Sequence, residues 1–390
     1  MKKLLMLSAK EMEIPFILQA QMLGYYVITT GNAPNQPGHK YADEYIKFDY
    51  SDYDGITRMA EDKGISAVMR GCSDNCALTA AYICEKLGLK GHDSFEVTKI
   101  IHRKNEFKKF ANKYDIKTPI GTCFSSLSEA LDQSIGFSLP VIVKPNDLAG
   151  GQGVSIVRQH SEFKAAIEKA FLSSNSKNIV IEPYIEGTLH SLHVFLVDKK
   201  VRAFGTANDY SYLNKFMTSY GVFPADNWNI AVRALIPEIE RIAEILDLVD
   251  GQIDTQYIMR NEEPFIIEMM RRSPGNHTTA VISNSIGLNW REWIVRAEAG
   301  ESIKGMPHSN FPQKYYGYYC AMPSHNGAYN KIFIDDDFAN NVLQVEEWEQ
   351  AGHIVKNYLY EKMGIVLFYF DSKEEAKDKL SRINSLIQVI

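Results

Sequence analysis

A glycine-rich loop between two apolar runs is the feature that most constrains the fold of this chain. Residues 139–145 read as a buried strand ending in lysine and proline, residues 146–154 form the loop, and a second strand follows at 154–158. Glycines let a backbone approach phosphate oxygens and point N–H groups at them. Because a strand follows the loop, it is neither a P-loop nor a dinucleotide-binding fingerprint, which both open a helix. A ligand-free β-hairpin turn stays open as the alternative. The loop residues of interest are Gly150, Gly151, Gln152 and Gly153.

The first ninety residues or so alternate short β-rich runs with helical patterns. Alternation of this kind predicts a parallel sheet covered on both faces. Ligands of open parallel sheets bind beyond the carboxyl ends of the strands, where the turns at 8–9, 30–32 and 71–74 lie. Ser73, in the last of these turns, is therefore a candidate substrate contact, and an ordinary solvated turn is the alternative.

The rest of the chain continues the alternation of strands and helices. A single charged helical pattern runs from 93 to 114, and strands and helices then alternate through residue 183. Between 187 and 300 we expect two strands, a helix, and a hairpin-like pair of strands at 251–259 and 264–269. The remaining residues predict a small α+β domain. We therefore expect domain boundaries near residues 97 and 300.

Charge and cysteine content narrow the classes of function. The 42 Lys and Arg against 48 Asp and Glu give a net charge of −6, so no global positive field exists to hold nucleic acid or an anionic membrane. No apolar run approaches the ~20 residues of a membrane-spanning helix, and the run at 4–7 is too short for a signal peptide. We expect a cytoplasmic protein. The five cysteines favour free thiols, and Cys72 and Cys76 lack the spacing and partners of a zinc site.

Several polar features recur along the chain in a fixed order. Lys104 comes first, then Lys144 before the glycine-rich loop, an acidic strand end at 179–187, and Gln256 and Glu268 on a late strand pair. In this order they resemble the ATP-grasp superfamily. The sequence is most similar to its carboxylate–amine ligases and to the synthetase halves of the carbamoyl phosphate synthase large subunit, with kinship to glycinamide ribonucleotide synthetase and biotin carboxylase. The resemblance implies an α/β and α+β multidomain architecture: a Rossmann-like domain over 1–97, an ATP-grasp domain over 98–300 with a lid at about 118–186, and a small C-terminal α+β domain over 301–390.

The resemblance implies an ATP site built from the lid and its hinge. Lys104 and Lys144 stand where the family places two phosphate-binding basic residues, and two cationic groups suit a triphosphate. For Lys104, one more charge on a solvated helix is the alternative. The family usually binds the ribose through a carboxylate, but that position is Leu189, so we assign the contact to His190. The hinge that holds the adenine in the family matches Glu182, Tyr184 and Ile185.

The resemblance also implies a magnesium site on the late strand pair. Gln256 and Glu268 match the metal ligands of carbamoyl phosphate synthase, where the first is likewise a glutamine. Magnesium takes oxygen ligands, so an amide and a carboxylate oxygen are adequate. Asp254 shares a strand face with Gln256 and is the alternative ligand. The next family ligand, an asparagine, is replaced by Met270, and a thioether is a poor magnesium ligand.

Arg272 matches the arginine that follows in the family, and with Lys144 it would act in catalysis by stabilising charge on the transferring phosphoryl group. Beyond it, Asn276 and His277 fit the family's loop near the acceptor substrate. The resemblance therefore implies an enzyme that uses ATP and Mg²⁺ as cofactors. We expect a ligase that activates a substrate carboxylate as an acyl phosphate for attack by an amine and releases ADP and phosphate.

Three alternatives stay open. The enzyme could activate bicarbonate, as carboxylating relatives do. The departures at Met270 and Leu189 suggest a nucleotide-binding protein that has lost catalysis. A plain α/β protein, whose loop and acidic strands are structural, is the third. The expected partners of the ligase are a small-molecule carboxylate and an amine, and a homodimer is among the assemblies that the resemblance implies.

Overall fold

The computed structural model describes residues 2–148, 150–310, 312 and 314–390. It begins with a four-stranded parallel sheet of order β3-β2-β1-β4. Leu4 and Met6 of its first strand pack into one apolar core and Leu5 and Leu7 into another, so both faces of the sheet are covered. The parallel sheet predicted from the alternating pattern is confirmed. Its elements are β1 (Lys3–Leu7), α1 (Ile14–Met22), β2 (Tyr26–Gly31), β3 (Glu44–Lys47), α2 (Tyr53–Asp62), β4 (Ala67–Met69) and α3 (Asp74–Leu87).

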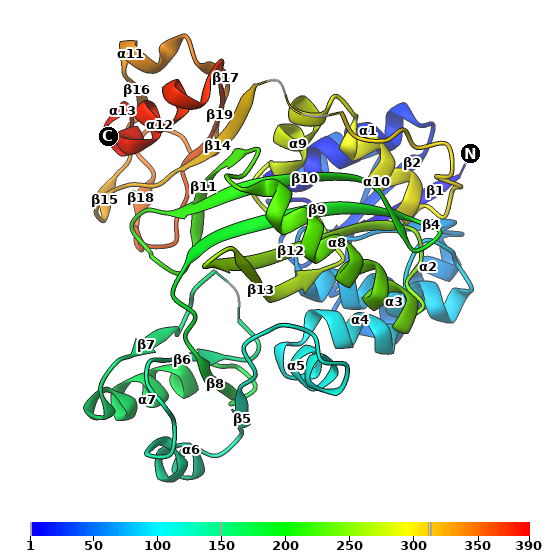
Figure 1. Ribbon diagram of the computed structural model, residues 1–390. Helices are drawn as coiled ribbons and strands as arrows, with labels where there is room; N and C mark the ends of the chain where they lie inside the picture. The colour runs from blue at the N-terminus through cyan, green and yellow to red at the C-terminus, as the bar shows by residue number, and fades with distance from the viewer. Residues whose placement is uncertain (1, 149, 311, 313) are drawn as a thin grey trace.

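An eight-stranded antiparallel sheet forms the centre of the molecule, in the order β13-β12-β9-β10-β11-β14-β19-β17 (Figure 1). This sheet continues past residue 300, because three of its strands come from the last part of the chain. The C-terminal part therefore shares one sheet with the segments that precede it. The strands are β9 (Thr188–Val197), β10 (Lys200–Ser211), β11 (Thr218–Phe223), β12 (Gly251–Arg260), β13 (Glu263–Met270), β14 (Tyr315–Ala321), β17 (Val342–Glu347) and β19 (Gly364–Phe370).

Different helices cover the two faces of the central sheet. Along β9 the side chains alternate between the faces. Leu192 and Val194 join the core beneath α8 (Trp228–Ile245), whereas Phe195 and Val197 join a core with α9 (Thr278–Ile286) and α10 (Trp290–Glu298). The parallel sheet packs into this second core as well. In the described part of the chain, no helix is both long and apolar enough to cross a membrane.

A small antiparallel sheet stands away from the central one and is joined to it at the β8–β9 hinge (Figure 1). It has its own apolar core, to which two helices contribute. We call this unit, residues 118–186, the lid. Its elements are β5 (Thr122–Phe124), α6 (Leu127–Ser134), β6 (Val141–Pro145), β7 (Ser155–Val157), α7 (Phe163–Ser173) and β8 (Ile179–Pro183), with strand order β5-β8-β6-β7.

The segment from 93 to 114 is not one helix, as the charged pattern predicted, but two. Residues Phe95–His102 form α4 and Lys104–Lys113 form α5, with Arg103 between them in an extended conformation. The break has a tertiary cause, since the backbone N–H of Asn105, the second residue of the new helix, is bound by a lid side chain, Asn146. The break redirects α5 toward the lid.

The remaining elements form the C-terminal α+β part. The charged sequence Val342–Glu347 pairs as the edge strand β17, which the sequence analysis did not predict, and β11 was also missed. Both strands are recognisable only through their partners in the sheet. The fold class predicted from the sequence is confirmed. The other elements here are β15 (Gly327–Ala328), β16 (Ile332–Ile334), α11 (Asp336–Ala339), β18 (Ile354–Val355), α12 (Lys373–Ser381), α13 (Ile383–Leu386) and β20 (Ile387–Val389).

Candidate active site between the lid and the central sheet

The glycine-rich loop joins β6 to β7, and its glycines leave the backbone uncovered by side chains of their own. Gly150, Gly151 and Gly153 have φ angles of 66°, 75° and 70°, in the left-handed region that strains any side chain. A Cβ on Gly151 would also lie 2.6 Å from the Cβ of Phe216, on the connection between β10 and β11. Gln152 is exposed in the same loop. The loop therefore needs glycine both for its conformation and for its close approach to the central sheet.

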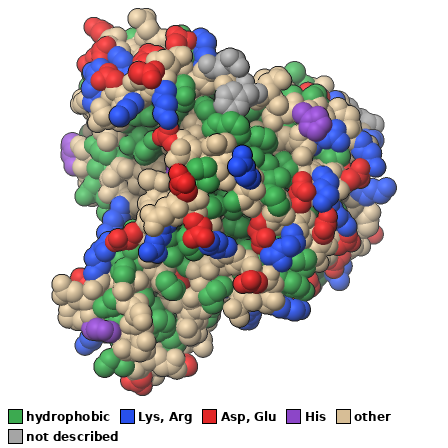
Figure 2. All heavy atoms as spheres, viewed as in Figure 1, with side chains coloured by type: hydrophobic (Ala, Val, Ile, Leu, Met, Phe, Trp, Pro, Cys, Tyr) green, Lys and Arg blue, Asp and Glu red, His purple; other side chains and the backbone are tan. Residues whose placement is uncertain are grey.

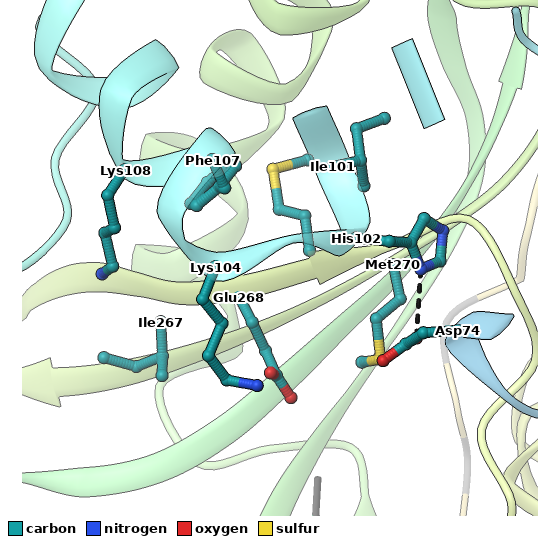
Figure 3. Close-up of a pocket in the computed structure, with 10 residues that line it drawn as sticks. Asp74, Ile101, His102, Lys104, Phe107, Lys108, Ile267, Glu268 and Met270 are labelled. Atoms are coloured by element: carbon teal, nitrogen blue, oxygen red, sulfur yellow. Dashed lines mark hydrogen bonds and ion pairs between the residues drawn. The ribbon is translucent and has the colours of Figure 1, made fainter. Parts of the chain in front are cut away.

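Lys104 and Asn105 fasten this loop to the start of α5. The Nζ of Lys104 donates to the carbonyl oxygen of Leu148 at 2.8 Å. The backbone N–H of Asn105 donates to Oδ1 of Asn146 at 2.9 Å, and Nδ2 of Asn146 donates back to Oδ1 of Asn105 at 3.0 Å. In Figure 3 the amino group of Lys104 and the carboxylate of Glu268 point toward each other from α5 and β13. Lys104 thus lies between the loop and the proposed metal ligand.

Glu182 is held by two lysines. Lys144 Nζ contacts its Oε1, and Lys108 Nζ lies 3.3 Å from its Oε2. Burial opposes ionisation of Glu182, but the two ammonium groups outweigh it and hold the pKa of this carboxyl below its usual 4.5. Burial lowers the pKa of Lys108 to about 8, although Glu182 opposes this shift. The result is a buried cluster of two lysines and one glutamate between the lid and α5, whose excess positive charge suits a polyanionic ligand.

Lys108 was missed by the sequence analysis. It lies one helical turn after Lys104 on α5, so the two side chains project from the same side of the helix. Its amino group also donates to Oγ1 of Thr118 at 2.7 Å, and only 4% of the residue is exposed. The helical spacing was the available signal, but burial of the side chain depends on the lid and is not visible in the sequence.

The hinge residues Tyr184 and Ile185 are half-buried where the lid meets β9. The backbone N–H of Tyr184 donates to the carbonyl oxygen of Pro140 at 3.0 Å, and the guanidinium of Arg158 lies 5.6 Å from the centre of the Tyr184 ring. Figure 2 shows acidic and basic side chains gathered on the surface where the lid meets the rest of the molecule. The adenine contacts assigned to these two residues stay a prediction.

His190 lies apart from the other predicted ATP contacts. Its ring stacks on Tyr257, with the centroids 5.3 Å apart, and Tyr257 belongs to the core beneath α8. Strand alternation puts the next residue, Ser191, on the opposite face, which also carries Gln256. The structure therefore places His190 on the other side of the sheet from the proposed metal ligands, and we do not assign it the ribose contact.

Gln256 and Glu268 are direct cross-strand partners on β12 and β13. Their amide and carboxylate oxygens are the hard donors that magnesium prefers. Asp254 is not free for this role, because His193 Nδ1 contacts its Oδ1 and Gln252 Nε2 donates to its Oδ2 at 2.6 Å. Among the described residues, no group of three or more His, Cys, Asp or Glu side chains is placed to hold a metal ion. The donor set of Gln256 and Glu268 fits magnesium, with further oxygens to come from phosphate and water.

Arg272 is anchored by the first domain. Its Nε lies 2.9 Å from Oδ1 of Asp74, the first residue of α3, and His102 Nδ1 lies 3.0 Å from the same oxygen (Figure 3 shows the second contact). Burial opposes ionisation of Asp74, but Arg272 and His102 outweigh it and hold the pKa of this carboxyl well below its usual range. Ser73 caps α3 by accepting from the N–H of Cys76 at 3.3 Å, which gives it a structural role. The Asp74 contact fixes the guanidinium beside β13.

Of the two predicted substrate residues beyond Arg272, Asn276 lines a cavity and His277 faces the C-terminal part. His277 Nε2 lies 3.0 Å from Oε2 of Glu346 on β17, and Arg291 lies 3.3 Å from its Nδ1. Asn276 lines a cavity of about 50 Å³ together with Gln256, Met270 and Asp209. Burial raises the pKa of Asp209 to about 7. Asp209 was not predicted from the sequence, since a single acid in a mixed polar and apolar strand carries no motif.

Known proteins share both the sequence pattern and the fold of this chain. Residues 103–216 match the phosphoribosylglycinamide synthetase ATP-grasp (A) domain family. A phosphoribosylglycinamide synthetase from Anaerococcus prevotii has 20% sequence identity and a TM-score of 0.77, over 100% of this chain and 99% of that one. An L-amino acid ligase from Bacillus licheniformis has 18% identity and a TM-score of 0.83, over 100% of this chain and 98% of that one. This chain has the ATP-grasp fold.

The curated proteins that are similar in sequence to this chain include the carbamoyl phosphate synthase large chain. The large chain of Thermoanaerobacter sp. (strain X514) is 23% identical over 227 residues, which make up 57% of this chain and 21% of that one. The matched part therefore spans about a fifth of the relative's length. The resemblance to the ATP-grasp superfamily predicted from the sequence is confirmed.

The ATP-grasp fold of this chain brings together residues that are far apart in the sequence. Asp74, His102, Lys104, Lys108, Glu268 and Met270 line one pocket, although they come from the first domain, two helices and a late strand (Figure 3). Lys144 and Glu182 adjoin it through Lys108. The roles assigned to these residues stay predictions.

Proposed function

We propose that this chain is an ATP- and Mg²⁺-dependent ligase that phosphorylates a substrate carboxylate and transfers the acyl group to an amine. The observation that carries the proposal is the pairing of Gln256 with Glu268 opposite Lys104, with Arg272 held beside them. These groups combine a divalent-metal donor pair with cations for phosphate. The same arrangement would suit a ligase that makes a C–N bond and would also suit a bicarbonate-activating enzyme, and the choice of carboxylate distinguishes the two.

The proposed chemistry needs no protein nucleophile. A carboxylate oxygen of the substrate attacks the γ-phosphorus of ATP, the bond to the β-phosphate oxygen breaks, and ADP leaves. An amine then attacks the acyl carbon, and inorganic phosphate departs with the carboxylate oxygen while the amine loses a proton to solvent. Magnesium, when bound, would neutralise charge on the β- and γ-phosphates. Lys104, Lys144 and Arg272 would supply the remaining positive charge around the phosphoryl group.

The lid would protect the acyl phosphate from water. The glycine-rich loop contacts the β10–β11 connection at Phe216 and the start of α5 at Asn105, so it is held from two sides beside the proposed phosphate site. Backbone N–H groups of such a loop can bind phosphate oxygens without a side chain. Closing the lid would exclude water, which would otherwise hydrolyse the acyl phosphate before the amine attacks it.

The test compares two acidic residues of the same strand. Glu268→Ala removes the carboxylate donor, whereas Glu263→Ala removes an exposed glutamate of β13 that pairs with Lys117. We expect Glu268→Ala to lower substrate-dependent ADP release by about two orders of magnitude or more, and Glu263→Ala to retain the wild-type rate. The assay measures ADP release across amino acids, simple carboxylates and bicarbonate. Wild-type turnover by Glu268→Ala would show the site assignment to be wrong.

A further inference from the structure

A second cavity lies beside the proposed metal pair on the same face of the central sheet. Its volume is about 50 Å³, and Gln256 and Met270 form the wall that it shares with the metal site. Asp209 of β10, Ser191 of β9 and Tyr318 of β14 are among its other polar lining residues, which also include His193, Thr218, Asp254, Thr255, Asn276 and Thr278. A group bound in this cavity would therefore sit next to the phosphoryl-transfer position.

Asp209 is the unusual member of this lining. Only 8% of the residue is exposed, and its carboxylate faces the neutral donors Ser191 and Gln256. The charge of nearby His193 favours ionisation of Asp209, but the ring nitrogens of His193 contact other partners, since Nδ1 contacts Asp254 and Nε2 lies 3.0 Å from Ser191 Oγ. In the part of the chain that the structure describes, no lysine or arginine forms an ion pair with Asp209. A buried carboxylate that forms no ion pair with a lysine or arginine carries a large desolvation penalty.

Two other buried acids of this chain do have counter-ions, whereas buried Glu13 accepts from the backbone N–H groups of Lys10 and Cys72. Asp93 is paired with Arg271 at 2.8 Å, and Glu298 with Arg70 at 3.2 Å. Asp209 differs from Asp93 and Glu298, because it borders the cavity and forms no ion pair with a lysine or arginine of the described chain. Gly221, opposite Asp209 in the sheet, helps to leave that space, since a Cβ there would lie 3.2 Å from Asp209 Oδ1 and 2.9 Å from Tyr318 Cε1.

We propose that Asp209 receives the protonated amino group of the substrate whose carboxylate is activated, so that the substrate class is amino acids. This proposal rests on the proposed function and deepens it. An ammonium group fits a small cavity, donates to Asp209, and supplies the missing positive charge. In an amino acid the ammonium and the carboxylate are close together, as are this cavity and the proposed metal pair, which share Gln256.

The experiment compares amino acids with carboxylates that lack only the amino group, such as alanine with propionate and lactate. Binding is measured by thermal shift in the presence of Mg-ADP, and turnover by ADP release from Mg-ATP. The variants are Asp209→Asn, which removes the charge at constant shape, and Gly221→Ala, which narrows the cavity but keeps the acid. Asp226→Asn, an exposed acid paired with Lys373, is the control.

We expect amino acids, but not their deaminated analogues, to bind the wild type. Asp209→Asn should raise the KM for the amino acid roughly ten- to hundredfold, leave the Mg-ATP shift unchanged, and raise the melting temperature of the unliganded protein. Gly221→Ala should weaken amino-acid binding, and Asp226→Asn should not. Equal turnover of the deaminated analogues, or an unchanged KM in Asp209→Asn, would overturn this inference while leaving the ligase function standing. Asp209-dependent binding of amino acids without ADP release would support the inference and overturn the ligase function.

Discussion

At the scale of single residues, the contacts of Glu182 show that the role of a lysine depends on the residues around it in the fold. Lys144 was predicted as a phosphate-binding residue from the ATP-grasp resemblance, and a lysine that ends an apolar strand is unusual in itself. Lys108 has the same partner but looks like one of several charges on a helix. Met270, in contrast to Lys108, stands out in the sequence because it replaces the asparagine of the family. The structure places its side chain in the wall of both cavities.

The lowered pKa of Lys108 predicts how stability depends on pH. The unfolded lysine keeps its proton up to about 10.5, whereas the folded one releases it from about 8. Between these values the unfolded state binds more protons, so this residue makes stability rise with pH. Compared with Lys108→Met, the wild type should gain about 1 kcal/mol between pH 8 and pH 9 in urea unfolding. Parallel pH profiles of the two proteins would contradict this account of Lys108.

At the scale of elements, the glycine-rich loop depends on contacts outside the lid. Gly150 and Gly151 share a left-handed backbone, but their surroundings differ. A Cβ on Gly150 would meet only Met217 Sδ, at 4.0 Å, whereas a Cβ on Gly151 would collide with Phe216. The pair therefore separates backbone strain from packing against the central sheet.

Alanine substitution of each glycine tests this difference. Gly150→Ala should lower the free energy of unfolding by about 1–2 kcal/mol through its left-handed conformation. Gly151→Ala should lower it further, because the loop must also move away from Phe216. The comparison is made by thermal and urea unfolding without nucleotide. Equal losses in the two variants would show that the contact with Phe216 does not hold the loop.

Elements with a strong local pattern were predictable, and elements defined by their neighbours were not. The alternating runs of the first domain and the hairpin of β12 and β13 follow from periodicity alone. The break at Arg103 was missed because the lid, through Asn146, binds the start of α5. The edge strand β17 was missed because its exposed, charged sequence acquires strand geometry only by pairing with β19.

At the scale of the whole molecule, a buried ionic network joins the first domain to the central sheet. Arg271 is 1% exposed, binds Asp93 at 2.8 Å, and donates to the carbonyl oxygens of Gln252 and Val249, each at 2.8 Å. Burial opposes ionisation of Asp93, yet the arginines hold its pKa below the usual 3.8. Arg272, the next residue along the chain, is thereby held at a rigid junction.

Removing one partner of this network should be costly. Arg271→Met leaves Asp93 buried without its cation and should destabilise the protein by about 3–5 kcal/mol. Arg296→Met, at a half-exposed arginine that pairs with Glu292 and Glu301, should have an effect of at most about 1 kcal/mol. Urea unfolding measures both. A small loss in Arg271→Met would mean that the junction is not stabilised by this network.

The order of motifs along the chain was enough to predict the fold class, because each motif has its own local signature. The convergence of Asp74, Lys108 and Glu268 was not predictable, since it depends on how separate units pack. Asp209 was not predictable for the same reason, because its proposed role follows from the cavity around it and not from its neighbours in the sequence.

The central claim is that the chain activates a carboxylate as an acyl phosphate, and isotope transfer tests it most directly. The protein is incubated with Mg-ATP, an amine, and amino acids labelled with ¹⁸O in the carboxylate, and the inorganic phosphate is analysed by mass spectrometry. Because the carboxylate oxygen leaves with the phosphoryl group, the account predicts one ¹⁸O atom in the phosphate released by the wild type and none from Glu268→Ala. Carboxylate-dependent release of unlabelled phosphate by the wild type would contradict it.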